Sequence, residues 1–119
     1  MARILIAEDE EALRGFVARA LRLDGHDTTE AADGEDGLAK LRSGAYDLLL
    51  SDIRMPVMDG IELARRTHGE FPAIKILLMT GFADQRERAD DLARIVMDVV
   101  DKPFSLPDIR TAVSAALAA

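Results

Sequence analysis

The chain has 119 residues, of which 49% are hydrophobic, and this size and composition predict one compact domain over residues 1–119. It has no cysteine, and its two histidines lie far apart in the sequence, which excludes disulfides and thiolate metal sites and argues against a zinc site. The net charge of −7 argues against nucleic acid as a partner, and the lack of a signal peptide pattern or a membrane-span-sized apolar run predicts a cytoplasmic protein with no membrane span.

Short apolar runs alternate along the chain with segments in which apolar side chains recur every three or four residues. The short runs are typical of buried strands, and the periodic segments are typical of helices that pack on a sheet by one face. In chain order we expect a strand at 3–7, a helix with its apolar face over 13–21, a strand at 26–31, a helix at 34–42, a strand at 46–51, a helix at 61–70, a strand at 74–79, a polar helix at 84–94, a strand at 97–100 and a helix over 107–117.

This order of elements is (βα)5. Parallel strands that are joined by right-handed helical crossovers form one sheet with helices on both faces. We therefore predict an α/β fold with a doubly wound, five-stranded parallel sheet.

The chain is organised around residues 48–60, Leu-Leu-Leu-Ser-Asp-Ile-Arg-Met-Pro-Val-Met-Asp-Gly. This stretch begins as an apolar strand, reaches one carboxylate at Asp52 where the strand should stop, and then turns at Pro56 and Asp59-Gly60. Ligands of open parallel sheets bind in the crevice outside the carboxyl ends of the strands. Asp52 is therefore placed where chemistry would occur.

Polar residues follow the ends of four predicted strands: Glu8-Asp9, Asp52, Thr80 and Lys102. In a doubly wound sheet these ends meet in one crevice. Three carboxylates gathered there would repel one another unless a proton or a cation relieves them, and Mg²⁺ prefers oxygen ligands of this kind. Asp52 would then be either a metal ligand only or a nucleophile that forms an aspartyl-phosphate.

Each of these residues has an ordinary structural explanation when it is taken alone. Asp9 is suited to cap the N-terminus of the first helix, where acidic side chains also favour the helix dipole. Asp52 could cap a turn, Thr80 is a common strand residue, and isolated lysines such as Lys102 are usually solvated. The convergence of all of them at one edge of the sheet is what favours a functional site.

This set of residues closely resembles the receiver domain of two-component response regulators. The segment from Asp52 to Gly60 is similar to the central motif of that family, and the resemblance covers the whole chain. It implies a CheY-like, flavodoxin-like fold. It also implies a signalling module that is phosphorylated by a histidine kinase or a histidine phosphotransferase and that is not itself an enzyme.

The resemblance implies a role for each matching residue around the central carboxylate. Asp52 would be the phosphoacceptor and would share a Mg²⁺ ion with Asp9, a direct ligand, and with Glu8, which acts through water. The backbone carbonyl of Arg54 would be a further protein ligand. Phosphoryl transfer mostly requires positioning and charge neutralisation from a protein, so these roles agree with the chemistry of the residues.

The resemblance also implies a phosphate-dependent switch. Thr80 would hydrogen-bond one phosphoryl oxygen and Lys102 would pair with another, while Pro103 is a candidate for a cis peptide bond. Receivers usually carry a tyrosine or phenylalanine three residues before the lysine, and this sequence has Val99 there. The threonine half of the switch is therefore present and the aromatic half is missing, so the signal leaves by another route or is read on another face.

No effector domain is expected after the last helix, so the resemblance implies a stand-alone receiver that acts by binding. The segments 48–56, 78–89 and 99–106 further resemble the CpdR type of stand-alone receivers from α-proteobacteria. That group implies a phosphorylation-controlled adaptor for the ClpXP protease in cell-cycle control, active when unphosphorylated, with the ClpX unfoldase as its partner. The final Leu-Ala-Ala also resembles tails that this protease recognises, although an alanine-rich helix end is the simpler explanation.

Other classes of protein could carry some of these motifs, and the residues present leave some of these alternatives open and exclude others. A receiver cut from a longer response regulator or hybrid histidine kinase, or a phosphorelay intermediate, would carry the same motifs. A phosphatase with an aspartate nucleophile would need Asp-x-Asp after the first strand, and a cofactor binder would need a phosphate-binding loop where this chain has four acids. A receiver that works without phosphorylation is disfavoured because no site position is missing.

Arg54 and Phe82 flank the site and are candidates to limit the access of water to a phosphorylated Asp52.

Overall fold

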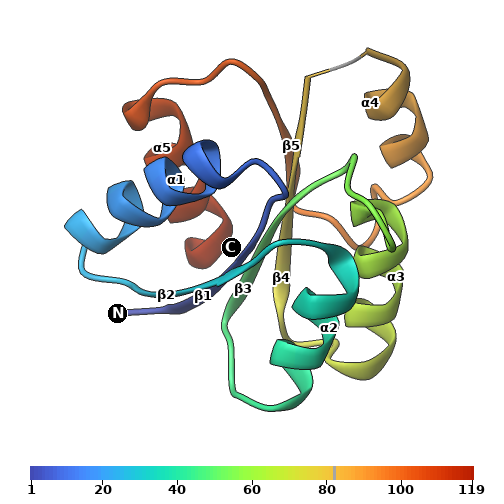
Figure 1. The fold of residues 1–119 in the computed structure, drawn as a ribbon, viewed down its shortest axis with the longest axis horizontal. Coiled ribbons are helices and arrows are strands. Elements are labelled where there is room, and N and C mark those ends of the chain that lie inside the picture. The colour runs from blue at the N-terminus through green and yellow to red at the C-terminus, as the bar shows by residue number, and fades with distance from the viewer. Residues whose placement is uncertain (82) are drawn as a thin grey trace.

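The computed structural model describes residues 1–81 and 83–119, with only the backbone of residues 83–85. Its centre is one five-stranded sheet in the order β2-β1-β3-β4-β5, in which all neighbouring strands are parallel (Figure 1). In chain order the elements are β1 (Arg3–Ala7), α1 (Glu11–Leu23), β2 (Asp27–Ala31), α2 (Gly34–Arg42), β3 (Leu48–Asp52), α3 (Gly60–Glu70), β4 (Lys75–Thr80), α4 (Ala83–Asp90), β5 (Asp98–Asp101) and α5 (Leu106–Ala118). Within this described part, no helix has the length and apolar character needed to cross a membrane.

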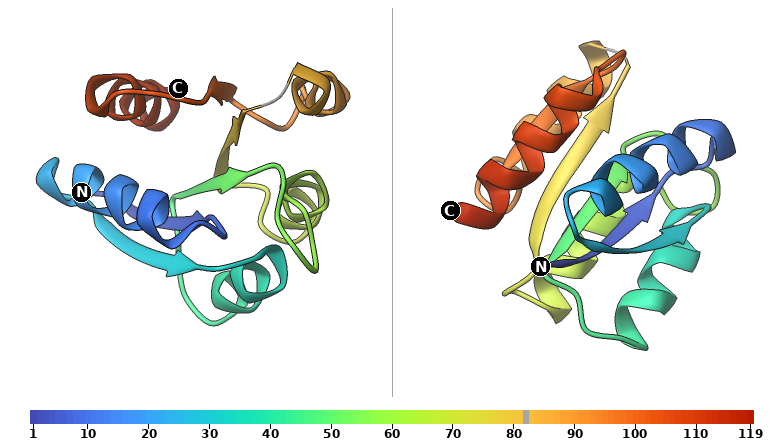
Figure 2. Two further views of the ribbon diagram at one scale, coloured as in Figure 1. Left: turned by 45° about the horizontal axis from the view of Figure 1, so that its top comes forward. Right: turned by 90° about the vertical axis from the view of Figure 1, so that its left-hand side faces the viewer.

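The helices divide between the two faces of the sheet. α1 and α5 cover one face, and α2, α3 and α4 cover the other (Figure 2). Side chains of successive strand residues point to opposite faces of the sheet. Ile4 and Ile6 pack beneath α1 and α5, while Leu5 and Ala7 pack beneath α2 and α3. Burial on both faces explains why the central strands are continuous apolar runs. The predicted doubly wound (βα)5 α/β fold is therefore confirmed.

One predicted boundary is wrong, and the others agree within two residues. Asp52, expected where the third strand stops, is the last residue of β3 and pairs with Met79 of β4. The helix that was predicted over 84–94 ends at Asp90. Residues 91–95 form turns instead, since Leu92 and Val96 are drawn into the core and the chain must turn to reach β5.

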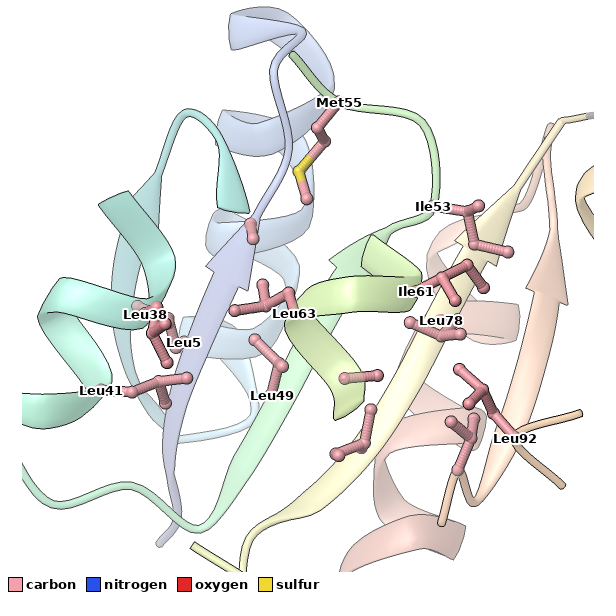
Figure 3. Close-up of a cluster of buried hydrophobic side chains, with 14 of the residues drawn as sticks. Leu5, Leu38, Leu41, Leu49, Ile53, Met55, Ile61, Leu63, Leu78 and Leu92 are labelled. Carbon is pink, nitrogen blue, oxygen red and sulfur yellow. The ribbon is translucent and has the colours of Figure 1, made fainter. Parts of the chain in front are cut away.

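The loop that follows β3 is anchored in the core on the α2–α3–α4 side. Figure 3 shows Ile53 and Met55 among the buried side chains of that core. Their exposed fractions are 0% and 8%. The backbone N–H of Ile53 also donates to the carbonyl of Met79, with a donor–acceptor distance of 3.0 Å. The chain therefore leaves Asp52 along a fixed path.

Candidate functional site

The carboxyl ends of four strands form one open pocket of about 660 Å³. Glu8 and Asp9 follow β1, Asp52 ends β3, Thr80 ends β4 and Lys102 follows β5. All five residues line the pocket, together with Glu10, Arg54, Met55, Pro56 and Gly81. The structure thus brings to one edge of the sheet every residue that was expected to converge there.

Three carboxylates in the pocket lie close enough to share one cation. Glu8, Asp9 and Asp52 each offer an oxygen, and these oxygens all lie within 4.8 Å of one another. Glu8 and Asp52 are buried, whereas Asp9 is exposed to solvent. Carboxylate oxygens are the donors that hard divalent cations prefer. The donor set and the open pocket therefore fit a cation such as Mg²⁺.

Asp9 does not cap the first helix, which was the ordinary explanation for its presence. The N-cap residue of α1 is Glu10, and its side chain makes no capping bond to the described part of the chain. The backbone N–H of Glu10 donates instead to Oε2 of Glu8 at 3.0 Å. Asp9 is one of the residues that line the pocket.

Lys102 places its ammonium group against two of the carboxylates. Its Nζ lies 2.8 Å from Oε1 of Glu8 and 3.2 Å from Oδ1 of Asp52. Burial raises the pKa of Glu8 and of Asp52, and the pairing with Lys102 opposes this rise only in part. Burial by itself lowers the pKa of Lys102, but the hydrogen bond to Glu8 and the charge of Asp52 outweigh it, so this pKa lies above its usual value.

The remaining predicted residues lie around the ends of β3, β4 and β5. Thr80 is buried as the last residue of β4, the strand next to Asp52. Arg54 is exposed at the pocket, while Phe82, which was paired with it as a shield against water, lies outside the described residues. The Lys102–Pro103 peptide bond is cis.

The chain matches the family model of the response regulator receiver domain over residues 4–114. The chain belongs to the response regulator receiver family. It is 42% identical over 109 residues to the response regulator receiver protein CpdR of Brucella abortus, which covers 92% of this chain and 91% of that protein. It is also 37% identical to the sensor protein EvgS of Escherichia coli, over 93% of this chain but only 9% of that much longer protein.

Solved receiver structures have the same fold. A CheY-like receiver domain protein from Methanospirillum hungatei matches with a TM-score of 0.91 and 28% identity, over 99% of this chain and 94% of that one. The response regulator TrrA from Thermotoga maritima, solved in complex with Mg²⁺–BeF, matches with a TM-score of 0.88 and 31% identity, over 98% and 99% of the two chains. The receiver fold is therefore shared over essentially the full length.

Val99, where receivers usually carry an aromatic residue, is bound to α4 through its backbone. It is half-buried in β5, and its carbonyl accepts a hydrogen bond of 2.8 Å from Nη2 of Arg86. The same guanidinium pairs with Asp101, the residue before the site lysine, at 3.2 Å. In this receiver an arginine of α4 therefore contacts the backbone of β5 at the atypical position. No local pattern in the sequence indicated this contact.

The loop after Asp52 in this receiver holds one strained residue. Val57 has a φ of 69°, in the left-handed region that β-branched residues rarely adopt, and its side chain is 74% exposed. The N–H of Met58 donates to the carbonyl of Pro56 at 2.8 Å, which forms a turn with Val57 at its centre. A second backbone bond, from Gly60 N–H to the Ile53 carbonyl at 2.8 Å, closes the loop. These bonds hold Val57 in a conformation that it would otherwise avoid.

We expect Val57→Asn to raise the free energy of unfolding by about 1 kcal/mol, because asparagine tolerates the left-handed conformation and little packing is lost at an exposed position. Urea unfolding followed by circular dichroism measures the change. Val57→Ala is the control, since alanine keeps most of the backbone strain and should gain less than half as much. If the asparagine variant is no more stable than the wild type, the backbone conformation of Val57 does not destabilise the protein.

Asp59 ends the same loop and joins it to two helices. Its Oδ1 accepts a hydrogen bond from the backbone N–H of Glu62 at 2.9 Å and caps α3. Its Oδ2 lies 2.6 Å from Nη2 of Arg88 in α4. Partial burial raises the pKa of Asp59, but its hydrogen bonds and the positive charge of Arg88 together outweigh burial, so this pKa lies below its usual value. The sequence did not indicate Arg88, because it is 29 residues away.

We expect Asp59→Asn to cost about 1 kcal/mol of stability at pH 7, since asparagine keeps the cap but loses the charge that Arg88 contacts. A lowered carboxylate pKa contributes stability that is present above the unfolded value, near 4, and is lost as the pH falls through the folded value. The difference between wild type and variant should therefore stay constant from pH 7 to about 5 and shrink below about 4.

Unfolding curves at several pH values measure this difference. A double-mutant cycle with Arg88→Met isolates the coupling of the two charges from other contacts of either residue. A difference that grew as the pH fell would contradict the lowered pKa.

Proposed function

We propose that this receiver accepts a phosphoryl group on Asp52 from a histidine kinase or histidine phosphotransferase in a Mg²⁺-dependent reaction and acts on its partners by binding. The observation that carries the proposal is the geometry of the pocket. One carboxylate at the end of β3 lies within reach of two further acids and 3.2 Å from a lysine ammonium. This arrangement supplies the positioning and the charge neutralisation that phosphoryl transfer requires.

In the proposed step, a carboxylate oxygen of Asp52 attacks the phosphorus of a phosphorylated imidazole. A phosphorus–oxygen bond forms, the phosphorus–nitrogen bond breaks, and its electron pair stays on the leaving imidazole. Lys102, already in contact with Asp52, would pair with one phosphoryl oxygen, and the hydroxyl of Thr80 would donate to another.

Asp9, Asp52 and the carbonyl of Arg54 would hold the Mg²⁺ ion directly, and Glu8 would hold it through water. When bound, the ion would neutralise charge on the transferring group. The clustering of three carboxylate oxygens supports this assignment, and the Mg²⁺–BeF complex of the related TrrA agrees with it. A bound cation would therefore explain why Glu8, Asp9 and Asp52 are clustered, since without it the three carboxylates would repel one another.

The test is intact-mass measurement after incubation with acetyl phosphate and MgCl2. We expect a gain of one phosphoryl group that disappears in Asp52→Ala and when EDTA replaces Mg²⁺. A gain that persisted in Asp52→Ala would move the modification to another residue. If acetyl phosphate gives no gain, a phosphorylated histidine phosphotransferase is the second donor, and failure with both donors would reject the proposed chemistry.

We propose further that this chain is a stand-alone receiver of the CpdR type, residues 1–119 forming one domain, and that it serves as a phosphorylation-controlled adaptor for the ClpXP protease. The support is the 42% identity to CpdR of Brucella abortus, together with the 91% coverage of that protein. A pull-down with purified ClpX tests this role. The unphosphorylated form should bind, and the phosphorylated form should bind less.

The second candidate is a receiver that belongs to a longer protein. The matches to the sensor protein EvgS and to the sensor kinase CckA of Brucella abortus, which cover 9% and 12% of those proteins, favour it. The length of the coding sequence distinguishes the two candidates. In either case the chemistry at Asp52 is the same, and the partner differs.

A further inference from the structure

We propose that Arg14 is a positioning residue that sets the cation affinity of this receiver by fixing the peptide unit between Glu8 and Asp9. The inference rests on the proposed function, because it concerns the Mg²⁺ site of that reaction. Arg14 lies in α1 and does not line the pocket. Its influence would therefore pass through the backbone of the acidic loop between β1 and α1.

Two contacts hold the guanidinium of Arg14. Its Nη1 donates to the backbone carbonyl of Glu8 at 2.8 Å, and its Nε donates to Oε1 of Glu30 in β2 at 3.2 Å. The side chain is only 17% exposed. A partly buried guanidinium that makes two charge-assisted hydrogen bonds has a narrow range of orientations, so it restrains the carbonyl of Glu8.

Every polar group of Glu8 has a partner in this arrangement. Its N–H donates to the Ala31 carbonyl at 3.0 Å, and its two carboxylate oxygens accept hydrogen bonds from Lys102 and from the N–H of Glu10. Arg14 supplies the partner of the remaining group, the carbonyl. That carbonyl belongs to the same planar peptide unit as the N–H of Asp9, so its orientation constrains where the Asp9 carboxylate points.

The start of α1 adds one contact to this loop, from the N–H of Glu10 to Oε2 of Glu8 at 3.0 Å, and this contact holds the side chain of Glu8 rather than its carbonyl. The N-cap residue Glu10 makes no side-chain capping bond to the residues that the structure describes. Asp9 itself is exposed to solvent. Arg14, one turn into the helix, therefore ties the acidic loop to α1 and to β2 at once.

The backbone of Glu30 is fixed in the sheet, while its side chain is 39% exposed and contacts Arg14. Glu30 lies in β2, paired with Ile6 of β1, and its own carbonyl accepts a hydrogen bond from Nζ of Lys40 at 2.6 Å. A lysine at position 14 would keep the positive charge but lacks the planar fork that donates to Glu8 and Glu30 together. This difference separates positioning from a simple charge effect on the carboxylates.

The experiment is calorimetric titration of MgCl2 into the full chain at low and high ionic strength. We expect Arg14→Met to weaken Mg²⁺ binding about tenfold, as typical for residues that orient metal ligands, and Arg14→Lys and Glu30→Gln to weaken it several-fold. Removal of a positive charge near the carboxylates would by itself strengthen cation binding, and salt screens that effect, so the loss of affinity should be at least as large at high salt.

Arg22→Met is the matched control. Arg22 lies on the same helix and also contacts β2, through a 3.1 Å hydrogen bond from its Nη1 to Oγ1 of Thr28, but at the far end from the pocket. It removes one positive charge and one α1–β2 contact, and it should change the affinity less than twofold. Circular dichroism checks folding, and if Arg14→Met does not fold, Glu30→Gln decides the matter.

Three results would overturn the inference in distinguishable ways. Equal affinities of Arg14→Met and Arg22→Met would remove the positioning role. Full affinity in Arg14→Lys would show that one cationic donor at position 14 is enough, and would remove the role of the planar guanidinium. A wild type that binds no Mg²⁺ would reject the proposed metal-dependent function and this inference with it, whereas the first two results would reject the inference only.

Discussion

Replacing Gly60 by alanine is expected to lower the free energy of unfolding by roughly 3 kcal/mol, the upper range for overpacking a rigid site. A Cβ atom on Gly60 would lie 2.0 Å from the carbonyl oxygen of Asp52 and 2.9 Å from Cα of Ile53. Both obstructing atoms belong to the backbone, and Ile53 is fully buried, so no flexible side chain can move aside. The clash can be relieved only by moving α3 away from the end of β3.

The change should also slow phosphorylation, because the new Cβ would press on the backbone carbonyl of Asp52 and α3 would move away from this end of β3. Gly69→Ala is the control in the same helix, since a Cβ there has no neighbour within 4 Å among the described residues. That variant should be more stable by about 0.5–1 kcal/mol, as expected for alanine in place of an exposed helical glycine. Urea unfolding compares the two, and a Gly60→Ala protein as stable as the wild type would show that the loop yields without cost.

Lys102→Met is expected to destabilise the receiver by about 3 kcal/mol in the absence of Mg²⁺, because removing one partner of a buried ion pair leaves the other uncompensated. Here one ammonium group serves two carboxylates, Glu8 and Asp52, which are 1% and 6% exposed. Methionine fills a similar volume, so the loss measures the charge rather than a cavity. Added Mg²⁺ should restore part of the stability, since a divalent cation replaces the lost compensation.

Thermal unfolding with and without MgCl2 measures both effects. Lys75→Met is the matched control, because Lys75 lies at the opposite end of β4, where its Nζ contacts the backbone oxygen of Ala119 at the surface. We expect it to cost less than about 0.5 kcal/mol, the usual range for exposed positions. Should Lys102→Met prove equally harmless, the two acids must be neutralised by protons rather than by the lysine.

The local pattern of the sequence determined the order and type of every element and the edge of the sheet where the site lies. Strand 3–7 and helix 34–42 agree residue for residue with β1 and α2, because burial on two faces or on one stripe leaves a periodic trace in the chain. Once the strands are parallel, polar residues at their carboxyl ends must meet at one edge. That is why Asp9, Asp52 and Lys102 were placed together correctly without any tertiary information.

The tertiary structure decided how those residues are held. Three features depend on packing that no local pattern encodes: whether Asp9 or Glu10 is the N-cap residue of α1, where α4 ends, and how closely Gly60 approaches Asp52. The partners of the arginines also depend on tertiary packing, since Arg14 and Arg88 pair with acids 16 and 29 residues away. The sequence does not distinguish a charged helix residue that is solvated from one that forms an ion pair. Only the approach of distant backbone segments determines which of the two it is.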